Sequence, residues 1–241
     1  MDGLLPILGL ALLPAAGNFA GGLLAEVWKP SARVLSAALH AAVGIMLAIV
    51  ATELLPEASA VLSGWVVGTA FVMGGVLYLA IEAGAQRLAG AKGGGKRMWL
   101  IYAAVAIDLL SDGLMIGSGG AVATALALKL AAGQVLADVP EGYAAAASFR
   151  ANDVPRGKRL LMLASFAIPV LLAATFAHLV LRDASDLWKF GALAVIAGLL
   201  SLAAIEDLLG EAHEHGADSK AAAMSFVGGF ALFVFVSAGL E

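Results

Sequence analysis

Cysteine is absent from the 241 residues of this chain, which excludes disulfide bonds and thiolate metal ligands. Charged residues are scarce, at 13% of the sequence, compared with about 25% in soluble domains. Apolar residues reach 61%, compared with about 45–50% in soluble domains, and the mean hydropathy is +0.95. This composition predicts an all-α integral membrane protein that crosses the bilayer several times.

Eight apolar segments separate along the chain, and each is long enough to cross a bilayer, which takes about 20 residues. They occupy residues 4–27, 34–55, 61–83, 98–118, 121–149, 160–181, 187–209 and 221–240. Because eight spans use about 160 residues, only short loops remain, and we expect one transmembrane domain over residues 1–241. No basic residue precedes the first span, so that span is predicted to be retained rather than cleaved as a signal peptide.

Basic residues are divided unequally between the two sides of the membrane. If the N-terminus lies outside, eleven of the 14 lysine and arginine residues fall in or beside the inner loops, and the outer side holds only Lys129, Arg182 and Lys189. Positively charged loops generally face the cytoplasm. The sequence therefore predicts a multi-pass protein of the inner (plasma) membrane with both termini outside.

Two neighbouring spans contain pairs of acidic residues at helical spacing. Asp108 and Asp112 are four residues apart, and Asp138 and Glu141 are three apart, so each pair shares one helix face. One carboxylate at the bilayer centre costs about 2.5–3.5 kcal/mol, so four cost on the order of 10 kcal/mol without compensation. Two such pairs facing each other would form a cage of hard oxygen ligands for a cation. We predict that these four residues bind a divalent metal ion; the alternative is a structural network of protonated carboxylates and hydroxyls.

A weak internal repeat supports the architecture of a transporter. Residues 44–58 and 198–212 share five of fifteen aligned positions, and the two spans cross the membrane in opposite directions. Inverted repeats of this kind are typical of transporters, whose binding sites lie between the repeats near the midplane.

These features resemble the ZIP (Zrt-, Irt-like) family of divalent-metal transporters, whose fourth and fifth spans carry motifs of the type His-Asn-x-Pro-Glu-Gly. In the fourth span, the family's His, Asn, Glu and Gly correspond to Asp108, Leu109, Asp112 and Gly113. In the fifth span, its His, Asn, Pro, Glu and Gly correspond to Ala137, Asp138, Pro140, Glu141 and Gly142. The second span and the seventh also resemble those of bacterial ZIP proteins, in the segments 40–58 and 207–216.

The resemblance implies eight helices in a 3+2+3 arrangement with an inverted repeat, usually as a homodimer, and alternating access of the elevator type. It also implies a transporter for zinc, iron, manganese or a related divalent cation, with the ion as substrate, and neither catalytic residues nor a nucleic-acid partner. Both motif histidines are absent, and the family's sixth-span Glu-Pro appears as Ile168–Pro169. Because carboxylates without thiol or imidazole suit Mn²⁺, Mg²⁺ and Fe²⁺, we expect selectivity to lean toward harder cations than in relatives with histidines.

Other polar residues in the spans are weaker candidates. His40 lies about two turns inside the inner end of the second span. A single histidine at such a position more often packs or bonds to the backbone, but it could instead be an inner-side ligand together with Glu206 and Asp207. Asn18 and His178 could line the pathway, although single polar residues in spans usually bond to the helix backbone.

Two alternatives to a transporter remain open at this point. One is a protein with the ZIP fold that binds or senses metal without moving it, which a measurement of flux separates from transport. The other is an intramembrane aspartyl-type protease, which would cleave a substrate. The Gly-x-Gly-Asp sequence of such proteases is absent, and the clustered acids exceed the two that a catalytic dyad needs.

Uptake is predicted to depend on pH. Close carboxylates hold protons when no metal is present, and metal binding releases those protons. Uptake of the ion into proteoliposomes should therefore fall as the pH is lowered from about 8 to about 5.5. A flat profile over that range would contradict the prediction.

Overall fold

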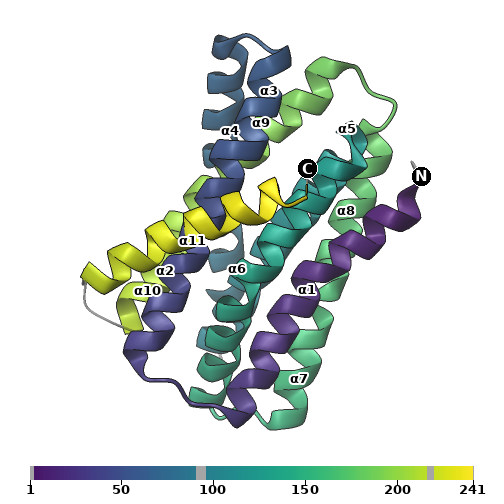
Figure 1. Cartoon of the computed structure of the whole chain (residues 1–241). Coiled ribbons are helices and arrows are strands. Elements are labelled where there is room, and N and C mark those ends of the chain that lie inside the picture. The colour runs from purple at the N-terminus through teal and green to yellow at the C-terminus, as the bar shows by residue number, and fades with distance from the viewer. Residues whose placement is uncertain (1–2, 91–95, 216–219, 241) are drawn as a thin grey trace.

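The computed structural model describes residues 3–90, 96–215 and 220–240, and the chain folds as an all-α bundle (Figure 1). Its helices are α1 (Leu4–Val27), α2 (Ala32–Ile49), α3 (Leu55–Val61), α4 (Gly64–Gly90), α5 (Lys96–Val122), α6 (Thr124–Ala151), α7 (Arg156–Ser165), α8 (Ala167–Leu181), α9 (Asp186–Ala203), α10 (Leu209–His215) and α11 (Lys220–Ala238). Two π-helical segments, η1 (Val50–Leu54) and η2 (Ala204–Leu208), join α2 to α3 and α9 to α10. When α2–η1–α3, α7–α8 and α9–η2–α10 are each counted as one helical unit, the described residues form eight such units.

Among the described residues, seven helical stretches are long and apolar enough to span a membrane. The protein is therefore an integral multi-pass membrane protein. The one predicted span that is not among these seven is the fifth, residues 121–149, which corresponds to α6; its 28 residues include Lys129, Asp138, Glu141 and Arg150. Figure 1 shows α6 running through the middle of the bundle, and it packs against α1, α2 and α5. Neighbouring helices, rather than lipid, thus surround much of this more polar helix; that it crosses the membrane stays a prediction.

The helices pack mainly in four pairs. α1 lies along α6, α5 along α8, α2 along α11, and α4 along α9. α1, α5, α6 and α8 also contact one another across these pairs, and α5 and α6 form most of the contacts with the remaining helices. The bundle therefore consists of two helix groups. The first contains α1, α5, α6 and α8, the second contains α2, α4, α9 and α11, and α5 and α6 lie where the two groups meet.

The two segments that align in the sequence also share two structural features. The π-helical segments η1 and η2 occupy corresponding positions in them. Gly44 and Gly198, also at corresponding positions, are each pressed against a neighbouring backbone, and a β-carbon there would overlap the carbonyl oxygen of Phe226 on α11 or of Phe71 on α4. Small residues allow such close helix crossings in membranes.

The predicted span 160–181 is interrupted, because α7 ends at Ser165 and α8 begins at Ala167. Pro169 lies one turn beyond the break. Since proline has no N–H and its ring clashes with the carbonyl four residues earlier, it breaks the helical ladder at Ser165. Pro14 and Pro140, in contrast, lie within continuous helices.

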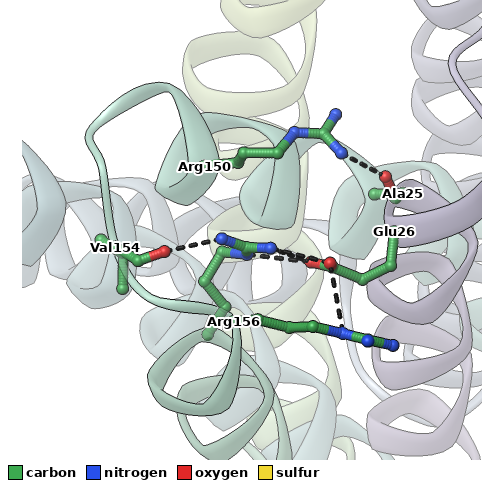
Figure 2. A network of polar contacts seen from close by, with 6 residues as sticks. Ala25, Glu26, Arg150, Val154 and Arg156 are labelled. Atoms are coloured by element: carbon green, nitrogen blue, oxygen red, sulfur yellow. Dashed lines mark hydrogen bonds and ion pairs between the residues drawn. The ribbon is translucent and has the colours of Figure 1, made fainter.

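A polar network joins α1 to the turn between α6 and α7 (Figure 2). Arg159 donates from Nη2 to both oxygens of Glu26, at 2.6 and 2.7 Å, and from Nη1 to the carbonyl of Val154 at 2.6 Å. Arg156 lies 3.6 Å from the same carboxylate, and Arg150 donates to the carbonyl of Ala25 at 2.7 Å. The network gives the Ala25 carbonyl in the last turn of α1 a side-chain donor and connects one end of α1 to α6 and α7.

A second network connects the two helix groups near the opposite end of the bundle. The buried carboxylate of Glu53 in η1 accepts a hydrogen bond of 2.5 Å from Ser237 on α11. Its other oxygen lies 3.6 Å from the ammonium of Lys129 on α6. The negative charge of Glu53 is therefore compensated across the interface between α6 and the α2–α11 pair.

Substitution of Gly198 by alanine should destabilise the α4–α9 pair, because the new β-carbon would overlap the Phe71 carbonyl. We expect the free energy of unfolding to fall by about 1–3 kcal/mol, the usual cost of overpacking. Gly191 on the same helix has open space around it, so Gly191→Ala serves as the control and should not destabilise the protein. Thermal unfolding in detergent, followed by circular dichroism, measures both, and a Gly198→Ala protein as stable as wild type would contradict the prediction.

Candidate metal site

Three of the predicted ligands meet where α5 lies against α6. Asp108 projects from α5, while Asp138 and Glu141 project from one face of α6 because they are three residues apart. Each offers a carboxylate oxygen, and these oxygens all lie within 4.8 Å of one another. We call these three residues the carboxylate triad. No other group of three or more histidine, aspartate or glutamate side chains this close is found among the described residues.

The triad is enclosed by protein. The exposed fractions of Asp108 and Asp138 are only 5% and 2%, and Glu141 is half-buried. Oδ2 of Asp138 is buried and has no hydrogen-bond partner within the protein. Burying a carboxylate oxygen without a partner is unfavourable, whereas a divalent cation between the three side chains would compensate both the charge and the missing contact. The donor set is all oxygen, as hard cations prefer.

Glu141 opens the triad to a cavity of about 350 Å³, which we call the acidic cavity. Glu206, Asp207 and Glu211 contribute the other acidic groups in its wall. Its remaining lining comes from α2, from the first half of α5, from the last turns of α6 and from η2 and α10, so it extends toward the end of the bundle where α5 begins and α6 ends. A volume of this size has room for several water molecules, at about 30 Å³ each, and thus for a partly hydrated ion.

Asp112, the fourth predicted ligand, is not one of the three. It is fully buried, and one of its oxygens accepts a hydrogen bond from the amide of Gln134 on α6. Sequence reasoning did not single out Gln134. The available signal was its position four residues before Asp138, which places it on the same helix face. The amide of Gln134 thus supplies one oxygen of Asp112 with a hydrogen-bond partner, while the other oxygen, Oδ2, has none within the protein.

The glycine that follows each acidic pair brings a neighbouring helix close to the site. A β-carbon at Gly113 would overlap the carbonyl of Val170 on α8, and one at Gly142 would overlap the carbonyl of Asn18 on α1. The Asn18 side chain is fully buried and donates from Nδ2 to Oε2 of Glu141 at 3.3 Å. The sequence pattern of acid followed by glycine thus combines a polar group with a close helix contact in both spans.

The three predicted inner-side ligands lie in two different cavities. His40 is buried, and its Nδ1 donates to the carbonyl of Ser36 at 2.7 Å. Its ring is 5.4 Å from that of His213, and both line a cavity of about 630 Å³ between α2, α10 and α11. Glu206 is exposed and Asp207 half-buried, and both border the acidic cavity instead. The role of each as a metal ligand stays a prediction.

Comparison of the sequence with protein-family models finds no match, and comparison with curated proteins finds none either. What is shown is therefore an all-helical, multi-span membrane protein with a buried carboxylate triad that could bind a metal ion.

The triad and Asp112 should respond differently to neutralisation. Asp138→Asn removes a charge from the triad, so Mn²⁺ affinity should fall by about 10–100-fold. Asp112→Asn should cost less, because Gln134 can still donate to the new amide oxygen. Isothermal titration of the detergent-purified variants measures both affinities. A loss from Asp112→Asn as large as that from Asp138→Asn would show that Asp112 also binds the ion.

Proposed function

We propose that the protein is a divalent-cation transporter of the ZIP type, which moves manganese, iron, zinc or a related ion across the inner membrane, toward the cytoplasm. The observation that supports this proposal is the carboxylate triad of Asp108, Asp138 and Glu141, whose oxygens lie within 4.8 Å of one another inside a membrane-spanning bundle. The ion is the substrate, and alternating access carries it past the site.

Charge compensation is the physical reason to expect a divalent cation. Three ionised carboxylates in a region of low dielectric repel one another and are strongly desolvated. No lysine or arginine is paired with the triad in the described ion pairs, which join Lys129 to Glu53, Arg156 and Arg159 to Glu26, and Arg182 to Asp183. A doubly charged ion would offset most of the triad's charge while remaining able to leave.

The acidic cavity supports a path for the ion on one side of the site. Glu141 belongs both to the triad and to the cavity wall, and Glu206 and Asp207 lie farther along that wall. An ion released from the triad would therefore next meet carboxylates at the protein–water boundary. In the orientation predicted from the basic residues, this cavity faces the cytoplasm, which favours import as the direction of flux.

The helix packing supports an inverted repeat. Consider an operation that exchanges α1 with α8, α2 with α9, α4 with α11, and α5 with α6. It turns the α1–α6 pair into α8–α5, and the α2–α11 pair into α9–α4. All four principal pairs are therefore consistent with one pseudo-twofold operation. The same operation exchanges η1 with η2 and the acid-bearing α5 with α6. Binding sites between such repeats are common in transporters.

Flux measurements on proteoliposomes test the proposal. Wild-type protein should accumulate Mn²⁺ and Fe²⁺ as well as Zn²⁺, because the donor set contains only carboxylates. Asp138→Asn and Glu141→Gln should each lower uptake by at least about 10-fold. Asp183→Asn is the matched control, because Asp183 is exposed in the turn after α8 and should leave uptake unchanged.

The same experiment separates transport from binding alone. Saturable Mn²⁺ binding without uptake would replace the transporter by a metal-binding or sensing protein. Unchanged uptake in both the Asp138→Asn and the Glu141→Gln proteins would place the pathway elsewhere in the chain.

A further inference from the structure

We infer that Asn18 supplies a fourth, neutral oxygen ligand to the cation held by the carboxylate triad, and thereby sets the site's preference for hard ions. This inference rests on the proposed function. It adds a residue from α1 to a site that the acidic motifs build from α5 and α6 alone.

The position of Asn18 is fixed by backbone contacts. A β-carbon at Gly142, the residue after Glu141, would overlap the carbonyl of Asn18. Gly21, one turn farther along α1, is pressed in the same way against the carbonyl of Val139. Because the two helix backbones touch on both sides of this position, the Asn18 side chain cannot withdraw from α6.

The side chain that is held there is directed at the site. Asn18 is fully buried, and its Nδ2 lies 3.3 Å from Oε2 of Glu141. Its own Oδ1 is buried and has no hydrogen-bond partner within the protein. An amide oxygen in this condition costs about 1–3 kcal/mol, so the residue is not explained by helix stability alone. The unpartnered Oδ2 of Asp138 is the second such atom at the same site.

A bound cation would give both unpartnered oxygens, Oδ1 of Asn18 and Oδ2 of Asp138, a partner. Without the ion, the N–H of the Asn18 amide is the favourable group to present to the Glu141 carboxylate. With the ion on that carboxylate, a half-turn of the amide about χ2 brings Oδ1 to the same side, because the two ends of the amide have nearly the same shape. The carbonyl oxygen then becomes a ligand, and the N–H is no longer required.

The added ligand affects selectivity. Amide and carboxylate oxygens suit Mn²⁺ and Mg²⁺, whereas imidazole suits zinc. Since Asn18 is neutral, it raises the number of ligands without adding to the negative charge of the triad. The site thus gains affinity for ions that take six oxygens, and the remaining positions are open to water from the acidic cavity.

The test compares three substitutions of Asn18 by their Mn²⁺ affinity in detergent, measured from the electron paramagnetic resonance signal of free Mn²⁺. Asn18→Leu removes the oxygen at similar volume and should weaken binding by at least about 10-fold. Asn18→Asp keeps an oxygen in place but loses the N–H, and should bind Mn²⁺ at least as tightly as wild type. Asn152→Leu, a change of the same kind at an exposed position, is the control and should have no effect.

Asn18→His makes the role of a ligand directly visible. An imidazole bound to Mn²⁺ should add a ¹⁴N hyperfine coupling that is absent from wild type, and the ratio of Zn²⁺ to Mn²⁺ affinity should rise by at least about 10-fold. Thermal unfolding of each variant establishes that it is folded before its affinity is interpreted.

Two results would overturn the inference. If Asn18→Asp weakens binding as much as Asn18→Leu does, the residue acts only as a hydrogen-bond donor to Glu141. If Mn²⁺ in the Asn18→His protein shows no ¹⁴N coupling, this position does not reach the ion. Failure of the proposed function has a different signature, because wild-type protein would then bind Mn²⁺ without taking it up into proteoliposomes, or the Asp138→Asn and Glu141→Gln proteins would take it up as wild type does.

Discussion

The need to compensate three carboxylates inside a membrane-spanning bundle governs the arrangement of this protein. Asp108, Asp138 and Glu141 lie close enough for one ion to contact all three, and at least one of their oxygens has no partner within the protein. The carboxylates of Glu26 and Glu53, in contrast, are each paired with a base, Glu26 with Arg159 and Glu53 with Lys129. The triad therefore differs from these ion pairs, because no basic side chain is paired with it in the described ion pairs and a bound cation could compensate its charge.

Glycine contacts give this site its geometry. Gly113 sets α5 against α8, and Gly142 sets α6 against α1, at the residue that directly follows each acidic pair. Close backbone contact leaves little freedom for the side chains on either side of it, so helix packing helps to hold the acids in place. The same contact that orients Glu141 also holds Asn18 beside it. Site geometry and helix packing therefore depend on the same few positions.

The site also lies where the two helix groups meet. α5 and α6 carry the triad and contact both groups, the acidic cavity has walls from both, and the network of Glu53, Lys129 and Ser237 crosses between them. Relative movement of the groups would alter access to the triad and would require the Glu53–Lys129 pair to separate. A transporter that alternates access needs this type of coupling between the binding site and an interface.

The sequence by itself determined the class of the protein, the positions of the helices and the faces on which the acids lie, because apolar length and helical spacing are local properties. It could not determine which neighbour each face meets. Only the tertiary structure separated Asp112, which is paired with Gln134, from the triad, brought Asn18 to Glu141, and put His40 beside His213 rather than beside Glu206 and Asp207. These outcomes depend on helix crossings set by glycines far apart in the chain, and no single span contains that information.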